Sequence, residues 1–87
     1  MRLERYWLVF TPNLDLPIGV SYGCGVTAYD YDDAVELLRF RVFGGADMPQ
    51  PLRTVSHVDI SSLDEKHVTP NMSDPLVRGV WFPRGYG

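Results

Sequence analysis

The sequence predicts an α+β fold: a small antiparallel sheet of three to four strands, in the chain order β-β-α-β-β, with one helix on one face and a long loop before the last strand. Two observations predict this class. Four short stretches are rich in β-branched and aromatic residues, and a stretch between them has apolar residues at the spacing of an amphipathic helix. A single domain, 1–87, is expected, because domains usually contain about 100 to 150 residues.

The first two strands are predicted before the helix. Residues 5–11 read Arg-Tyr-Trp-Leu-Val-Phe-Thr, which is typical of a strand, and Pro12 and Asn13 predict a turn after it. Between residues 18 and 28 apolar side chains fall at every second position, which is the period of a strand with one apolar face. The opposite positions hold small residues: Gly19, Ser21, Gly23, Gly25 and Thr27.

The helix is predicted from Tyr31 to Phe43. Asp30 is its expected N-cap, because a carboxylate there accepts hydrogen bonds from the free amides of the first turn. Gly44 and Gly45 predict a left-handed end. Its apolar face consists of Ala34, Val35, Leu38 and Val42, with Leu37 and Phe40 on the flanks.

Two further strands are predicted after the helix, at residues 53–60 and 78–82, and Pro83 ends the second. Residues 61–77 lie between them and have no sustained period. Structureless loops longer than about 12 to 15 residues are uncommon in compact domains. This segment is therefore a candidate binding loop, lid or Ω-loop.

The predicted strands carry apolar residues on both faces, although one helix can cover only one of them. In the first strand Trp7 and Val9 point away from the face that holds Tyr6, Leu8 and Phe10. In the fourth strand Trp81 is expected to oppose Val80 and Phe82.

Three alternatives follow for the second face. In the first, residues 61–77 fold over it through Leu63, Val68, Met72 and Leu76 and complete a core that so short a chain needs. In the second, Trp7 and Trp81 form a surface that binds another protein or a second copy of the chain, since aromatic anchors concentrate binding energy at interfaces. In the third, the face holds a groove for a small ligand.

Composition and charge narrow the function. The 45% hydrophobic and 22% charged residues fit a globular domain rather than a disordered chain. Eleven acidic against eight basic residues give a net charge of −3, the wrong sign for a nucleic-acid partner. No apolar run approaches the roughly 20 residues that cross a bilayer, and no signal peptide is evident, so no membrane partner and a cytoplasmic location are expected.

Two motifs of catalytic or cofactor-binding type have simpler interpretations. Residues 23–28 match the dinucleotide-binding pattern G-x-G-x-x-A, but their last three residues continue an alternating strand instead of opening a helix. Cys24, the single cysteine, excludes an internal disulfide and falls on the apolar face of its strand. A buried apolar role is therefore expected for Cys24 in place of a nucleophile activated by His57 or His67. No cofactor is expected.

The densest set of polar side chains is His57, Asp59, Asp64, Glu65 and His67. Its spacing matches no established metal motif, so surface residues and turn caps are expected, with no metal. His57, Asp59 and His67 are nevertheless the candidate polar group if the chain binds a ligand or is a small enzyme. Asp59 with Glu36 is a further candidate carboxylate pair.

Four acids, Asp30, Asp32, Asp33 and Glu36, lie at the start of the predicted helix. Capping and solvation explain them. The alternative is an acidic patch that steers a basic partner, in which Asp32, Asp33 and Glu36 form the rim and Tyr29 and Tyr31 supply contact area.

Several segments resemble a family of small uncharacterised bacterial proteins: Gly25-Val26-Thr27-Ala28-Tyr29, Asp33-Ala34, His67-Val68-Thr69-Pro70-Asn71-Met72 and Arg78-Gly79-Val80-Trp81-Phe82-Pro83. The resemblance implies a bacterial or phage origin and carries over no activity. In size and acidity the chain is also similar to immunity proteins, which inactivate toxins by binding them.

The first functional hypothesis is therefore a non-enzymatic protein-binding module, most concretely an immunity- or inhibitor-type protein. It would bind through the acidic helix start or the sheet face that holds Trp7 and Trp81. A small enzyme or ligand-binding domain around His57, Asp59 and His67 is the second hypothesis, and a structural homo-oligomer subunit is the third.

Overall fold

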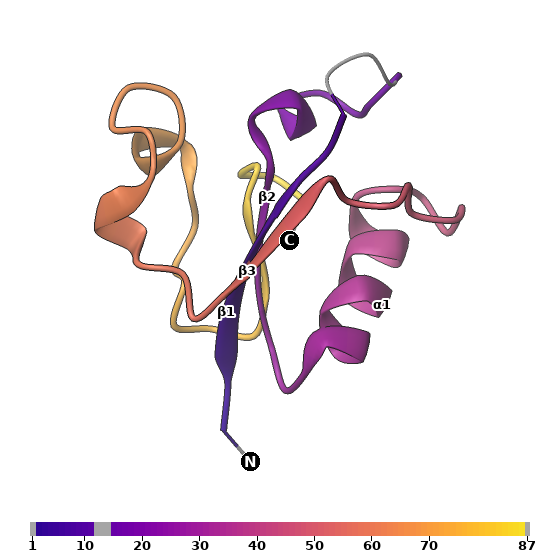
Figure 1. The fold of residues 1–87 in the computed structure, drawn as a ribbon, viewed down its shortest axis with the longest axis horizontal. Coiled ribbons are helices and arrows are strands. Elements are labelled where there is room, and N and C mark those ends of the chain that lie inside the picture. The colour runs from indigo at the N-terminus through magenta and orange to yellow at the C-terminus, as the bar shows by residue number, and fades with distance from the viewer. Residues whose placement is uncertain (1, 12–14, 87) are drawn as a thin grey trace.

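The computed structural model describes residues 2–11 and 15–86 and has the predicted fold class (Figure 1). Four antiparallel strands form one sheet in the order β3-β1-β2-β4. The elements are β1 (Glu4–Val9), β2 (Cys24–Ala28), α1 (Tyr31–Arg41), β3 (Arg53–Ser56) and β4 (Gly79–Phe82), with single 3-10 turns at Val20–Tyr22, Ile60–Ser62 and Thr69–Asn71. The turn predicted at Pro12 and Asn13 lies outside the described residues.

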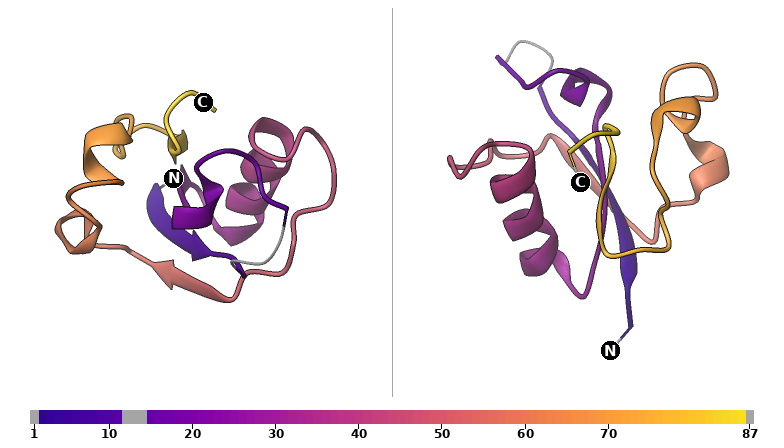
Figure 2. Two further views of the ribbon diagram at one scale, coloured as in Figure 1. Left: turned by 90° about the horizontal axis from the view of Figure 1, so that it is seen from above. Right: turned by 180° about the vertical axis from the view of Figure 1, so that it is seen from behind.

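The layers are visible in Figure 2: α1 covers one face of the sheet and the segment after β3 covers the other. The apolar set that was predicted for the helix side is buried between α1 and the sheet, and it includes Tyr6, Leu8, Phe10, Val26, Ala34, Leu38 and Val80. The domain therefore has two apolar clusters, one on each side of a single sheet.

Helix α1 begins as predicted. The Asp30 carboxylate accepts a hydrogen bond from the Asp33 amide at 2.8 Å, and the Asp33 carboxylate accepts one from the Tyr29 amide at 3.0 Å. Two amides at the helix start thus have partners. The helix ends at Arg41, two residues before the predicted end at Phe43.

The second predicted strand is wrong in its first half. Residues 20–22 form a 3-10 turn flanked by Gly19 (φ 86°) and Gly23 (φ 122°), and β2 begins only at Cys24. These left-handed conformations break the strand, and glycine adopts them without the strain of a side chain. As a result Ile18, predicted on the apolar face, is 91% exposed.

The third predicted strand is also too long. It ends at Ser56, because His57 has a φ of 54° and turns the chain away from the sheet. The Asp59 carboxylate then accepts hydrogen bonds from the amide and the hydroxyl of Ser61, which caps the turn at Ile60–Ser62.

The second face is covered by the chain itself, which confirms the first of the three alternatives. Val58, Leu63, Val68 and Met72 pack against Trp7, Trp81 and Phe82. The two indoles stack with ring centroids 5.9 Å apart and planes at 25°. Trp7 is 6% and Trp81 1% exposed, so the expectation that they form an open partner surface is wrong. Leu76 was expected in this cover but is exposed.

The two indoles fit here because the face of β2 that they pack on carries small residues and leaves them room. A Cβ atom on Gly25 would lie 2.3 to 2.5 Å from three ring atoms of Trp81, and one on Gly23 would lie 2.6 Å from the Trp7 ring. A β-bulge changes which face of the sheet the last residues of β4 point to. Gly25 pairs with Phe82, and the next residue, Val26, pairs with Val80. Trp81 is the extra residue, and Phe82 consequently lies on the same side as Trp81 instead of opposite it.

A chain of hydrogen bonds through Thr27 holds the segment that covers the second face against the sheet. The Trp81 indole Nε1 donates to the Thr27 hydroxyl at 3.1 Å, and that hydroxyl donates to the carbonyl of Pro75 at 2.6 Å. Thr27 and its bond from Trp81 are buried, and the bond to Pro75 is partly buried. The Ser73 amide also donates to the Trp81 carbonyl at 2.7 Å. The segment is therefore a fixed wall of the second core.

Substituting Gly25→Ala should destabilise the fold by about 1 to 3 kcal/mol, because the new methyl group meets the face of the Trp81 ring. Urea unfolding followed by fluorescence measures the change. The matched control is Gly44→Asn: a Cβ atom there meets nothing within 4 Å, and asparagine tolerates the left-handed conformation after a helix. Equal losses for the two variants would contradict the packing argument.

Substituting Thr27→Val should cost about 1 to 3 kcal/mol of the free energy of unfolding, because it leaves the Trp81 N–H and the Pro75 carbonyl without this partner. Thr54→Val on β3 makes the same chemical change at an exposed position, where a loss within about 0.5 kcal/mol is expected. Hydrogen exchange should also quicken near residue 73 in the first variant only.

Candidate functional site

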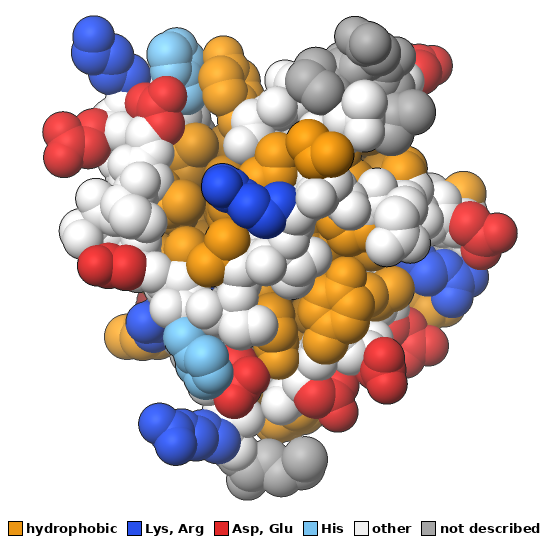
Figure 3. Space-filling model, in the orientation of Figure 1, with side chains coloured by type: hydrophobic (Ala, Val, Ile, Leu, Met, Phe, Trp, Pro, Cys, Tyr) orange, Lys and Arg blue, Asp and Glu red, His pale blue; other side chains and the backbone are white. Residues whose placement is uncertain are grey.

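The candidate ligand group of His57, Asp59 and His67 is not brought together. The His57 Nε2 lies 3.6 Å from a Glu4 carboxylate oxygen, and Asp59 caps its own turn. His67 Nδ1 lies 3.1 Å from the Asp64 carboxylate. The two histidines, pale blue in Figure 3, are well separated on that face of the molecule. Within residues 2–11 and 15–86 no three His, Cys, Asp or Glu side chains are grouped as metal ligands.

Two other chemical candidates are also separated or buried. Glu36 lies on α1, and Asp59 caps the turn at Ile60–Ser62, which lies across the sheet from α1 (Figure 1), so they do not form a carboxylate pair. Cys24 is fully buried, and this burial raises the pKa of its thiol to about 12. The thiol is therefore protonated at neutral pH and packs as an apolar side chain, as predicted.

The start of α1 presents less free negative charge than the sequence indicates, because one of its carboxylates is paired with an arginine. The Arg78 guanidinium makes two hydrogen bonds to the Asp33 carboxylate, Nε to Oδ2 at 2.9 Å and a shorter one from the second nitrogen. It also lies 5.2 Å from the centre of the Tyr29 ring. Asp33 thus holds a cation and part of the helix cap, and cannot at the same time present a free charge to a partner.

Three of the other exposed side chains of α1 form a ridge. Asp32, Glu36 and Phe40 follow one another at intervals of four residues, so they stand above one another along the helix. Phe40 is 63% exposed, and Tyr29 next to the helix start is also exposed. Tyr31 contributes less, because its ring packs edge-on against Tyr6 at 5.9 Å. We call Tyr29, Asp32, Glu36 and Phe40 the α1 surface.

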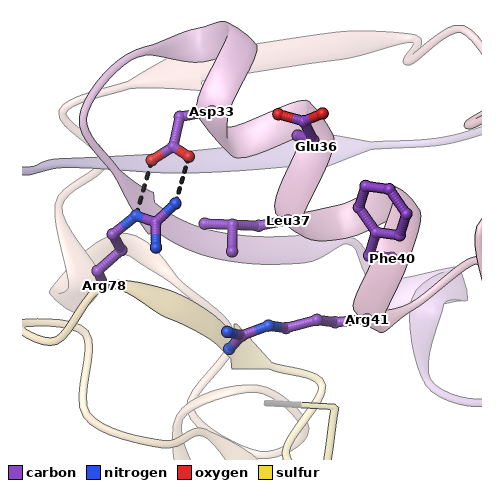
Figure 4. Close-up of a pocket in the computed structure, with 6 residues that line it drawn as sticks. All are labelled: Asp33, Glu36, Leu37, Phe40, Arg41 and Arg78. Carbon is purple, nitrogen blue, oxygen red and sulfur yellow. Dashed lines mark hydrogen bonds and ion pairs between the residues drawn. The ribbon is translucent and has the colours of Figure 1, made fainter.

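A hollow of about 330 Å³ borders this surface. Figure 4 shows the Asp33–Arg78 pair at one end, Phe40 and Arg41 at the other, and Leu37 between them. The hollow thus joins an apolar floor to charges of both signs. Acidic side chains gather over the start of α1 in Figure 3.

A second hollow, of about 630 Å³, lies where the turn at Val20–Tyr22 meets the chain after β4. We call it the C-terminal hollow. Six of its lining residues, Ile18, Tyr22, His67, Asn71, Arg84 and Tyr86, come from three separate parts of the sequence. The Tyr22 and His67 rings stack with centroids 5.0 Å apart and planes at 13°.

Sequence reasoning missed Phe40 and the C-terminal hollow. Phe40 was placed on the flank of the apolar face, although the four-residue spacing from Asp32 and Glu36 indicates the polar side. For the hollow, the glycines around Ile18 and Tyr22 were a local signal that the strand is interrupted there.

No protein-family model, curated protein or solved structure matches the chain in comparisons with known proteins. The one helix of the described residues is too short to cross a bilayer. The functional argument therefore depends on the two surfaces themselves.

Substituting Arg78→Gln should change how stability depends on pH. The hydrogen bond from Arg78 holds the pKa of Asp33 below its usual range. The stability that this pair contributes is therefore fully present above the ordinary carboxyl pKa of about 4 and is lost as pH falls through the lower, folded-state value. In chemical unfolding, the difference in the free energy of unfolding between wild type and variant should be constant from about pH 5 to about pH 7. It should narrow below about pH 4.

The control for this experiment is Arg53→Gln, which removes an exposed arginine from β3 and leaves Asp33 untouched. Its pH profile should run parallel to that of wild type. A gap for Arg78→Gln that stays constant down to acid pH would show that the ion pair does not depend on the ionised Asp33.

Proposed function

We propose that this chain is a non-enzymatic protein-binding module that docks on a basic protein partner through the α1 surface. The observation that carries this proposal is Phe40, a large apolar side chain that the fold leaves 63% exposed at the end of the helix ridge that also holds Asp32 and Glu36. An exposed aromatic residue with a charged surround is the composition of an interface anchor.

Each residue of the surface has a distinct part in this proposal. Phe40 and Tyr29 supply apolar contact area, and Asp32 and Glu36 attract a basic partner and speed its association. The hollow beside Phe40 gives a partner side chain a place to enter. Arg78 serves the surface indirectly, because its contacts with Asp33 and Tyr29 hold the edge of the hollow in place.

The most concrete form of this function is an immunity- or inhibitor-type protein of bacterial or phage origin, acting in the cytoplasm. A small acidic domain with a rigid helix face can block a basic enzyme without any chemistry of its own. The tight N-cap of α1 supports this role, because a surface that is already ordered loses less entropy on binding.

The test is affinity capture from a lysate of the source organism with the immobilised chain, read by mass spectrometry. The variant Asp32→Lys/Glu36→Lys should lose a protein that wild type retains, and Phe40→Ala should weaken its retention about tenfold or more while leaving folding unchanged. The matched control Asp47→Lys/Glu65→Lys makes the same charge change at exposed positions elsewhere and should retain the partner.

High salt should also release the partner, because exposed charges are screened. Retention that is the same for wild type and for both α1 variants would overturn the proposal. Light scattering on the purified chain tests the remaining alternative, in which the partner is a second copy of the chain. A dimer that Phe40→Ala converts to a monomer would identify the partner as that second copy.

A further inference from the structure

The C-terminal hollow is built from residues that the α1 surface does not use. Its volume of about 630 Å³ lies within the range of about 300 to 1,000 Å³ that is typical of small-molecule sites. Its walls are fixed on two sides: the Arg84 amide donates to the Asn71 carbonyl at 3.1 Å, and the Tyr86 hydroxyl donates to the Ile18 carbonyl at 3.1 Å. These bonds join the chain after β4 to two other segments.

One wall of the hollow is flat and aromatic. Tyr22 and His67 stack nearly parallel, and a 3.1 Å contact with the Asp64 carboxylate fixes the orientation of the His67 ring. Tyr22 is half exposed and Ile18 almost fully exposed, so much apolar area here still faces water. Because the two rings already cover each other's facing sides, a planar apolar ring would pack on what this pair and Ile18 leave open.

The charge of the hollow has the opposite sign to that of the chain. The protein carries a net charge of −3, yet none of the described residues that line the hollow is acidic, and Arg84 brings a cation to it. Among the described residues no carboxylate pairs with this guanidinium. A guanidinium presents its N–H groups as a fork that fits a carboxylate.

We propose that the C-terminal hollow binds a small aromatic carboxylate, whose ring packs against Tyr22, His67 and Ile18 and whose carboxylate pairs with Arg84. The apolar wall selects the ring, and the Arg84 guanidinium selects the anion. This site is independent of the proposed docking of a protein on the α1 surface.

The experiment titrates 1-naphthoate into the isotope-labelled chain and follows amide chemical shifts. Saturable shifts centred on Ile18, Tyr22, His67 and Tyr86 are expected at submillimolar ligand. The neutral alcohol 1-naphthalenemethanol has the same ring and should bind about tenfold more weakly, because it offers no charge to Arg84.

Arg84→Gln should weaken naphthoate about tenfold and bring its affinity to that of the alcohol. Arg53→Gln removes another exposed arginine, on β3, and should leave both affinities unchanged. Tyr22→Leu keeps an apolar side chain but loses the flat ring, so both probes should weaken together.

Three results would overturn the site: no saturable shift at millimolar naphthoate, equal binding of the two probes to wild type, or full affinity in Arg84→Gln. Shifts centred on α1 instead of the hollow would also count against it. The variant Asp32→Lys/Glu36→Lys keeps every residue of the hollow, so naphthoate binding by this variant tests the site separately from protein docking.

Discussion

The packing of Trp81 on Gly25 is the contact on which the rest of this small domain depends. A single helix can cover only one face of the sheet, so the other face needs cover from irregular chain. Trp81 is the sheet residue on which that cover packs, because it stacks on Trp7 and lies where Gly25 has no side chain. Its indole N–H begins the hydrogen-bond chain through Thr27 to Pro75, which holds the covering segment in place.

This arrangement leaves two surfaces for function. The segment that covers the second face of the sheet is held in place by its contacts. The sequence made it a candidate lid, but its apolar residues are part of the core. On one side of the sheet the N-cap and the Arg78 pair order the α1 surface. Elsewhere the glycine-flanked turn at Val20–Tyr22 and the chain after β4 border the open C-terminal hollow. The two surfaces share none of the residues that define them.

The sequence predicted most of the fold, because local rules decide it. Period-two alternation placed Trp7 opposite Leu8, and Asp30 marked the start of α1. The errors occurred where tertiary structure prevails: two left-handed glycines broke a strand that alternated perfectly, and a bulge moved Phe82 to the face of Trp81. The site was harder, because the partner of Asp33 lies 45 residues away and the hollow joins three distant segments.

The close fit between residue 25 and residue 81 also limits how this chain can evolve. Any side chain at position 25 needs space that the indole occupies, and any smaller ring at position 81 leaves a void and removes the N–H that donates to the Thr27 hydroxyl. The two positions therefore behave as one unit under selection. A larger residue at 25 is tolerable only together with a smaller one at 81, and such paired replacements are the substitution pattern to expect among natural variants of this domain.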